Sequence, residues 1–182
     1  MSRADLNPFS YVVLALVGEG GAGAHDIVRM MRRGTAYWST SPSHYYAEPK
    51  RLAKLGYLRA EQTSGKTRPR THYSLTDRGR EALRAWAAEP TSFPRIQSEA
   101  VVRLLAADVA GDDAAVAASL AAMRAELDGI DASLAEAEAV AAALPHRERY
   151  LLLVHRLGRG LVELHRRWLD DVERELSGQP PE

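Results

Sequence analysis

The C-terminal half of the chain carries a long stripe of apolar residues that lie alternately four and three positions apart. This spacing places them along one side of an α-helix for about four heptads, a pattern typical of helices that pack lengthwise against a partner. Pro145 ends the stripe, and a second stripe with the same spacing follows. The sequence therefore predicts two long helices, joined by a short turn, that form an antiparallel pair. The first stripe consists of Val116, Leu120, Met123, Leu127, Ile130, Leu134, Ala137, Ala141 and Leu144, and the second of Tyr150, Val154, Leu157, Leu161, Leu164 and Trp168.

Together the two stripes offer more apolar surface than two helices can cover by themselves. A second copy of the chain is the simplest partner, because most soluble oligomers are symmetric homo-oligomers. We therefore predict that residues 91–182 form a helical dimerisation domain. The side chains expected at the dimer contacts are Leu120, Leu127, Leu134, Leu157, Leu161, Leu164 and Trp168.

The charge of the chain is balanced as a whole but divided between its halves. Residues 1–90 hold 14 Lys and Arg against 8 Asp and Glu, a net charge of +6. Residues 91–182 hold 10 against 16, a net charge of −6. A basic half beside an acidic half favours an anion-binding module joined to something else. Because prolines, serine and threonine interrupt the helical pattern over 87–99, we place the domain boundary near residue 90.

Several classes of protein are disfavoured by the composition. The 182 residues include no cysteine, which removes disulfides, thiol catalysis and thiolate metal sites. No apolar run approaches the ~18–20 residues of a membrane span, and the first residues lack a signal-peptide pattern. A soluble cytoplasmic protein without membrane partners is therefore expected.

Enzymatic and metal-binding motifs find no support in the sequence either. The glycines between Gly18 and Gly23 are not followed by the lysine of a phosphate-binding loop, and no Ser/His/Asp order with a nucleophile turn occurs. His146, His155 and His165 lie nine and ten residues apart, which fits no i,i+4 pair of metal ligands on a helix. We therefore expect neither catalysis nor a metal or other cofactor.

The N-terminal half reads as three helices, a two-stranded hairpin and a fourth helix. Asn7 and Pro8 suit the N-cap and first position of a helix, as do Ser41 and Pro42, and Gly56 suits a left-handed helix end. This order is that of a winged helix-turn-helix, whose third helix enters the major groove of DNA. We expect helices from Pro8 to the glycines at 18–23, over 24–33, from Pro42 to Gly56 and from Thr76 or Asp77 to about Ala88, with strands over 57–62 and 71–75.

The third helix separates its residue types by face. With positions placed 100° apart, Tyr45, Pro49 and Leu52 share one side of the helix. The opposite side is small and polar at its start and cationic towards its end, which suits short side chains near bases and long cations near phosphates. A solvated amphipathic helix is the alternative. The side chains predicted to face DNA are Ser43, His44, Tyr46, Ala47, Lys50, Arg51 and Lys54.

Pro49 lies in the middle of this helix, where a proline costs about 3 kcal/mol. It removes the hydrogen bond to the Tyr45 carbonyl and biases Glu48 away from helical angles. On the helical wheel, however, its ring fills an apolar position on the buried side. We therefore predict one helix that is bent near 45–49.

The loop that joins the two predicted strands is also basic. Lys66, Arg68 and Arg70 lie at the hairpin tip with no acidic residue among them. Two consecutive basic elements at winged-helix spacing favour DNA contact, because such cations release counterions from the duplex. An arginine of this loop can also enter a narrow minor groove.

The residues of the third helix and of the wing together resemble the PadR-like family of transcriptional regulators. The matching segments are "SHYYAEPKRLAKLGYL", "RTHYSLTDRGREAL" and "RAWAAEP". The resemblance covers about residues 6–90, and the long helical tail resembles the larger subtype of the family. The chain departs from the family pattern at Pro49, where leucine is usual, and at Gly23-Ala24-His25, where Gly-Tyr is frequent. The positions that carry the family pattern are Tyr46, Leu52, Gly56, Tyr73, Leu75, Thr76 and Gly79.

This resemblance implies a homodimer that binds a palindromic DNA operator, usually as a repressor, and that is often released by a small aromatic or hydrophobic effector. The implied fold class is mainly α: a winged helix-turn-helix N-terminal domain followed by a helical C-terminal dimerisation domain with a long antiparallel helix pair. Tyr37, Trp38 and Trp86 are candidates to line an effector pocket in the dimer, although packing in the core is the favoured interpretation. The alternative function is a winged-helix protein-interaction or ligand-binding module without DNA binding.

Overall fold

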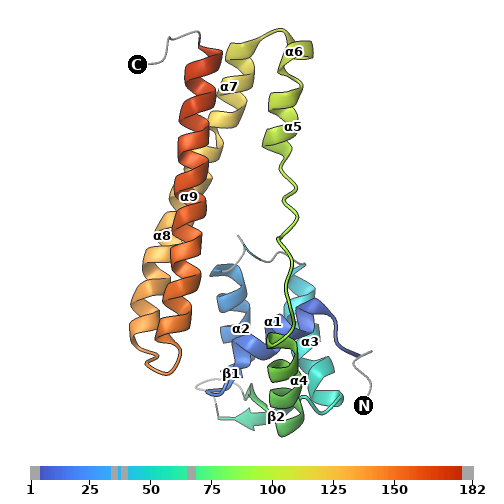
Figure 1. Cartoon of the computed structure of the whole chain (residues 1–182). Helices are drawn as coiled ribbons and strands as arrows, with labels where there is room; N and C mark the ends of the chain where they lie inside the picture. Colours follow the sequence, from blue (N-terminus) through green and yellow to red (C-terminus); the bar gives the residue numbers. More distant parts are fainter. Residues whose placement is uncertain (1–4, 34–36, 38–40, 65–68, 178–182) are drawn as a thin grey trace. The chain divides into compact units, whose positions relative to one another are not determined.

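The computed structural model describes residues 5–33, 37, 41–64 and 69–177. The chain forms two compact units, Met1–Ser92 and Phe93–Glu182 (Figure 1). The first unit combines helices with a three-stranded antiparallel sheet, and the second is helical. The predicted fold class, a winged helix-turn-helix followed by a helical region with a long antiparallel helix pair, is confirmed.

The first unit has the predicted order of elements with one short strand added. The added strand β1 pairs with β3, so the sheet order is β1-β3-β2 and every pairing is antiparallel. The sequence did not predict β1, because its two residues are too few to form a pattern. The elements are α1 (Pro8–Val17), β1 (Ala22–Gly23), α2 (Ala24–Arg33), α3 (Pro42–Lys54), β2 (Leu58–Thr63), β3 (Arg70–Leu75) and α4 (Asp77–Ala87).

Side-chain caps fix where two of these helices begin. The Asn7 side chain accepts a hydrogen bond of 2.9 Å from the Ser10 backbone N–H, and the Ser10 hydroxyl accepts one of 3.1 Å from the Asn7 backbone N–H. This reciprocal capping box confirms the predicted start of α1. Thr76 caps α4 by accepting from the Gly79 backbone N–H at 3.1 Å, and its hydroxyl donates to the Gly56 carbonyl at 2.7 Å. Gly56 has φ +77°, the left-handed conformation expected after α3.

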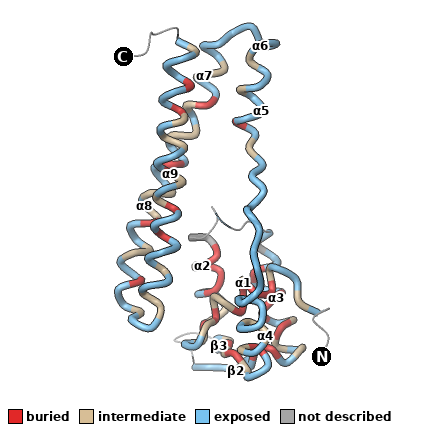
Figure 2. The backbone as a smooth tube through the Cα atoms, viewed as in Figure 1, coloured by how far each residue is buried: buried red, intermediate tan, exposed pale blue. Residues whose placement is uncertain are grey.

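The first unit encloses a closed apolar core. Leu14 of α1, Ile27 of α2 and Leu52 of α3 are each 0% exposed, and Leu58 and Leu75 from the sheet pack into the same cluster. Figure 2 shows the buried stretches of these elements in red. The three helices of the winged helix-turn-helix therefore share one core, which holds α3 firmly by its inner side.

The second unit consists of a long helix pair with three shorter helices. The shorter helices are α5 (Glu99–Leu105), α6 (Ala107–Ala110) and α7 (Asp113–Ala121). The first predicted stripe is divided between α7 and α8 (Met123–Ala142), and α8 packs lengthwise on α9 (Glu148–Leu176) (Figure 1). The stripe residues Leu120, Leu127 and Leu134 are buried in the apolar cluster of this unit. Because this cluster covers them within one chain, they form its core and do not form an exposed dimer surface.

The face of α9 that packs on α8 is one residue away from the second predicted stripe. The buried residues of α9 include His155, Val162 and Leu169. By contrast, Leu157 and Leu164 of the predicted stripe are 58% and 53% exposed. The remaining stripe residues are exposed at Tyr150 and Val154 and half-buried at Leu161 and Trp168. The helix is thus apolar on two adjacent faces, and within one chain the second of these faces stays largely in solvent.

Ion pairs cross between α8 and α9 along the edges of their contact. Arg159 contacts Asp131 and Glu138 at 2.8 Å each, and Arg166 contacts Asp128 at 2.7 Å. Such exposed pairs contribute little stability, so we attribute the cohesion of the helix pair to its apolar cluster and its alignment to these charges. Among the described residues, no helix is long and apolar enough to cross a membrane.

Candidate nucleic-acid interface

The third helix, α3, runs from Pro42 to Lys54 and includes Pro49 within its length. Tyr45 and Leu52 are 5% and 0% exposed, and Pro49 is among the most deeply buried side chains. The predicted division of faces, with Pro49 filling an apolar position, is therefore confirmed. The predicted bend near 45–49 stays a prediction.

The opposite face of α3 is open to solvent. Tyr46 is 41% exposed, and Ser43, Ala47, Lys50 and Lys54 are exposed around it. His44 is exposed at the edge of this face, with its ring centroid 6.4 Å from that of Phe9. Of the residues predicted to face DNA on this helix, these six share one accessible surface.

Glu48 and Arg51 lie beside this surface and are held inside the unit. Glu48 is only 7% exposed, and its carboxylate accepts hydrogen bonds from the Ser10 hydroxyl at 2.7 Å and from Arg51 at 2.6 and 2.8 Å. The Arg51 guanidinium also donates to the Ser10 hydroxyl at 2.9 Å and to the Asp5 carbonyl at 2.8 Å. This Ser10–Glu48–Arg51 network joins the first turn of α1 to the middle of α3.

The network changes the predicted role of Arg51. Each of its three guanidinium nitrogens donates to an acceptor within the unit, and together they use four of its five N–H donors. Burial by itself raises the pKa of Glu48, but the hydrogen bonds from Arg51 and Ser10 outweigh it and hold that pKa below its ordinary value. The carboxylate therefore stays ionised inside the unit and anchors α3 through Arg51.

The wing supplies a second cationic element. Strands β2 and β3 pair from Leu58 opposite Leu75 to Thr63 opposite Arg70, which places Arg70 where the hairpin loop begins. Arg70 is exposed, and within the described part of the chain no carboxylate forms an ion pair with Arg70, Lys50 or Lys54. Lys66 and Arg68, which the sequence also assigns to this loop, lie outside the described residues.

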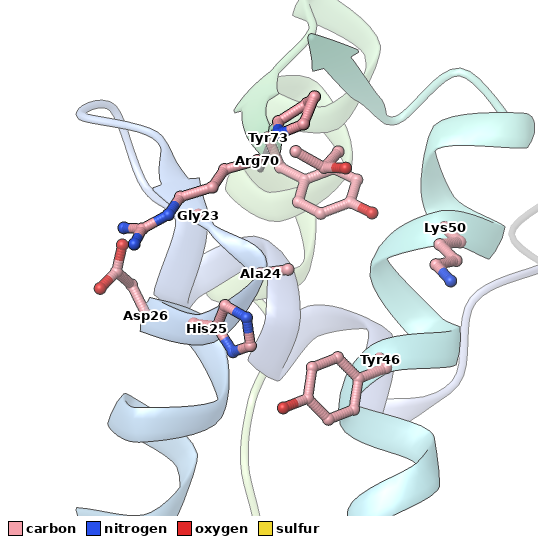
Figure 3. Close-up of a pocket in the computed structure, with 10 residues that line it drawn as sticks. Gly23, Ala24, His25, Asp26, Tyr46, Lys50, Arg70 and Tyr73 are labelled. Atoms are coloured by element: carbon pink, nitrogen blue, oxygen red, sulfur yellow. The ribbon is translucent and has the colours of Figure 1, made fainter. Parts of the chain in front are cut away.

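A cavity of about 290 Å³ lies between α2, α3 and β3. In Figure 3, His25 of α2 and Tyr46 of α3 are neighbours on one side, Lys50 follows along α3, and Arg70 and Tyr73 enter from β3. The His25 and Tyr46 rings meet edge to face with centroids 6.1 Å apart. Lys50 and Arg70 thus line the same cavity from two different elements, and the Arg70 side chain extends towards Asp26. The lining residues are Gly23, Ala24, His25, Asp26, Tyr46, Lys50, Pro69, Arg70, Thr71 and Tyr73.

One known protein family matches most of the first unit. Residues 13–85 match the transcriptional regulator PadR-like family. The predicted resemblance is thereby confirmed, and the matched segment extends from α1 into α4. No curated protein sequence matches the chain.

Solved structures of PadR-like regulators share the fold over nearly the whole chain. The PadR-like transcriptional regulator BC1756 from Bacillus cereus is 20% identical, with a TM-score of 0.74 over 95% of this chain and 100% of its own. Bacillus subtilis PadR in complex with operator DNA is 20% identical, with a TM-score of 0.74 over 94% of this chain and 97% of its own. The Vibrio cholerae virulence activator AphA is 24% identical, with a TM-score of 0.69 over 94% of this chain and 99% of its own.

The predicted effector residues of this PadR-like unit do not meet in one described site. Trp86 of α4 is 40% exposed and stacks on Tyr11 of α1, with ring centroids 4.7 Å apart and planes within 7°. Tyr37 is 38% exposed, and Trp38 lies outside the described residues. Trp86 therefore packs on Tyr11 at the surface of the unit and not in its core, where the sequence favoured it.

The sequence missed three residues of the PadR-like unit that the structure brings to this surface or directly behind it. His25 lines the cavity, while Ser10 and Glu48 form the anchor of α3. The spacing of Glu48 and Arg51, three residues apart on a helix, is a signal that sequence reasoning could have used. Ser10 lies 38 residues from Glu48, and no local pattern joins them.

Proposed function

We propose that this protein is a sequence-specific DNA-binding transcriptional regulator that acts as a homodimeric repressor. The observation that carries the proposal is the accessible face of α3, where Lys50 and Lys54 have no carboxylate partner among the described residues. Unpaired cations on a firmly held helix suit a polyanion, and the wing adds Arg70. The family match over 13–85 supports the same function.

In this proposal α3 lies in the major groove with its inner side held by the core. Ser43, His44 and Ala47, which are short or planar, lie nearest the base edges, while Tyr46, Lys50 and Lys54 contact phosphates. The wing residues Lys66, Arg68 and Arg70 contact the neighbouring backbone or minor groove. Arg51 is not among these proposed contacts, because four of its five N–H donors already bind Glu48, Ser10 and the Asp5 carbonyl.

The proposed dimer forms through the second apolar face of α9. Leu157 and Leu164 are more than half exposed in one chain, and Leu161 and Trp168 lie beside them on the same predicted stripe. A symmetric pair would place two recognition helices in successive major grooves about 34 Å apart, on half-sites of a palindrome. Sedimentation of the 20.0 kDa chain tests this directly, since a monomer at micromolar concentration contradicts the dimer.

The effector part of the proposal rests on a relative. Bacillus subtilis PadR, 18% identical over 93% of this chain and 98% of its own with a TM-score of 0.66, has also been solved in complex with p-coumaric acid. We propose that a small aromatic or hydrophobic molecule releases this protein from its operator as well. A panel of small aromatic acids tested for dissociation of the protein–operator complex decides this point, and no effect from any of them argues against it.

The deciding experiment is selection of bound sequences from a random duplex pool with the full-length protein. Enrichment of palindromes whose half-sites lie about 10 base pairs apart, centre to centre, supports the proposed function and its symmetry together. Absence of binding to any duplex at micromolar protein and low salt supports the alternative, a protein-interaction or ligand-binding module. A reporter gene placed behind the selected sequence then distinguishes repression from activation.

Lys50→Ala tests the proposed binding surface. Loss of one phosphate contact lowers the slope of log K against log salt by about 0.9 and weakens binding to all sequences alike. Arg84→Ala removes an equally exposed cation from α4, outside the proposed surface, and serves as the matched control. If the two variants have the same affinity and salt slope, the assignment of Lys50 is wrong.

A further inference from the structure

The cavity between α2, α3 and β3 is lined by more basic side chains than carboxylates. Lys50 and Arg70 are the cations, and His25 becomes one when it is protonated. Hydroxyl groups come from Tyr46, Thr71 and Tyr73. Small-molecule sites for apolar ligands are lined mostly by hydrophobic side chains, so this lining does not suit a hydrophobic effector.

The one acidic group of the cavity has its own partner. Asp26 forms an ion pair of 2.8 Å with Arg29, one turn further along α2. Lys50 and Arg70, by contrast, form no ion pair with a carboxylate among the described residues, and the His25 ring contacts the Tyr46 ring. The uncompensated charge at this place is therefore positive.

The composition of the cavity suits a phosphate group. A phosphate offers several strong acceptor oxygens, which charged and hydroxyl donors arranged around a hollow can satisfy together. Tyr46 and Lys50 belong to the face of α3 that we assign to DNA, so a duplex lying on that face brings its backbone to the mouth of the cavity. His25 on α2 then extends the contact to an element that the sequence did not assign to DNA.

We infer that this cavity receives one backbone phosphate of the bound duplex, that His25 and the Tyr46 hydroxyl donate to it, and that Lys50 and Arg70 at the two ends of the lining make its surroundings positive. The inference rests on the proposed DNA-binding function and adds a specific contact to it. Histidine is the side chain that in general gains a proton between about pH 8 and pH 5, so pH is the variable that tests a phosphate contact through a histidine. The groups that face His25 are Asp26 on its own helix, Tyr46 and Lys50 on α3 and Arg70 on β3.

The test compares salt slopes of operator binding at about pH 6 and about pH 8 for the wild type and His25→Gln. The wild type should show a steeper slope at the lower pH by up to about 0.9, the value for one phosphate contact. In His25→Gln this difference should be lost, and affinity at the lower pH should fall about tenfold because a charge-assisted hydrogen bond is missing.

His72→Gln is the matched control, because His72 is a histidine of the same unit that does not line the cavity. The control should keep the pH difference of the wild type. A pH difference that survives intact in His25→Gln overturns the inference, whereas failure of the wild type to bind any selected duplex overturns the proposed function itself.

A second measurement identifies the source of the phosphate. Single methylphosphonates, which replace one charged phosphate with a neutral group, are scanned along the operator. At one position the neutral linkage should weaken binding of the wild type and leave His25→Gln almost unaffected. If no position shows this coupling, or if inorganic phosphate alone at millimolar concentration shifts the NMR signals of His25 and Tyr46 as strongly as operator DNA does, the cavity is not a site for a duplex phosphate.

Discussion

The two units of the molecule differ in how far their leucine side chains are buried. In the first unit, Leu14 and Leu52 are 0% exposed and belong to a core that one chain closes by itself. In the second unit, Leu157 and Leu164 are 58% and 53% exposed although they lie in the middle of a long helix. A helix that is apolar on two faces can satisfy only one of them against a single neighbour.

This difference teaches where each unit obtains its stability. The first unit needs nothing beyond its own chain to bury its large side chains. The second unit leaves contiguous apolar surface in solvent, which soluble proteins usually reserve for an interaction. Stability measurements should therefore separate the two units, because only the second one should depend on protein concentration.

The largest difference between the stabilities of the two units is expected from Leu→Ala changes at one buried and one exposed leucine. Leu14→Ala should lower the free energy of unfolding by about 2–5 kcal/mol at every protein concentration, because it leaves a cavity in a closed core. Leu157→Ala should lower apparent stability only at concentrations where the dimer forms, because dimerisation stabilises by mass action. Urea denaturation at two concentrations measures both, and an equal, concentration-independent loss in the two variants contradicts the comparison.

Glycine substitutions provide a second comparison of the two units, because the space around a glycine differs between them. A Cβ atom on Gly79 of α4 would lie 2.2 Å from the Tyr57 carbonyl oxygen, too close for any real contact. Gly79→Ala should therefore cost about 3 kcal/mol of unfolding free energy, since backbone atoms on both sides must move. Thermal unfolding measures the loss, with Arg84→Ala on the same helix as the control that should remain near the wild type.

Buried and exposed carboxylates provide a third comparison. Glu48→Gln should lower the free energy of unfolding by about 2 kcal/mol, because a buried charge-assisted network loses its anion. The hydrogen bond from Arg159 lowers the pKa of Glu138 too, but that pair lies at the surface of the second unit. Glu138→Gln should cost much less, and equal losses in the two variants would argue that burial is irrelevant here.

The effect of Glu48→Gln on the free energy of unfolding should depend on pH. The pKa of Glu48 is lower in the folded protein than its ordinary value, so its stabilising effect is complete above that ordinary value of about 4.3. The effect is lost as the pH falls through the lower, folded pKa. The stability difference between the wild type and Glu48→Gln should therefore stay constant above that ordinary value and shrink as the pH falls below it, which acid titrations of urea unfolding can follow.

The smallest effect is expected at a glycine of the second unit. A Cβ atom on Gly129 of α8 meets no other atom within 4 Å. Gly129→Ala should raise stability by about 0.5–1 kcal/mol, because alanine loses less conformational freedom than glycine in a helix. A loss in differential scanning calorimetry would indicate that this surface is covered in the assembled protein.

Local rules predicted most helix boundaries of the first unit. Asn7 with Pro8 marks the start of α1 through a capping box, and Pro42 marks the start of α3, where the Ser41 side chain makes no capping hydrogen bond. The inner side of α3, including Pro49, followed from helical periodicity alone. These features depend on neighbours in the sequence, which is why they could be read from it.

The features that the sequence missed depend on distant partners. The face of α9 that packs on α8 contains His155 and Gly158, which are not hydrophobic residues. The neighbouring stripe is more hydrophobic, so the sequence predicted that stripe as the packed face. The hydrogen bonds of Arg51 within the unit could not be predicted, because its acceptors on Ser10 and Asp5 lie 41 and 46 residues away. His25 joins the cavity only because the fold brings α2, α3 and β3 together.

The separation of the two faces of α3 has a consequence for how such a protein could be re-targeted. Folding depends on Tyr45, Pro49 and Leu52, whereas the proposed base contacts depend on Ser43 and Ala47, and none of these residues serves both purposes. If α3 binds DNA as proposed, Ser43 and Ala47 can be replaced to select new operators while the core packing of Tyr45, Pro49 and Leu52 stays unchanged. Stability and operator choice could then be engineered separately on one helix.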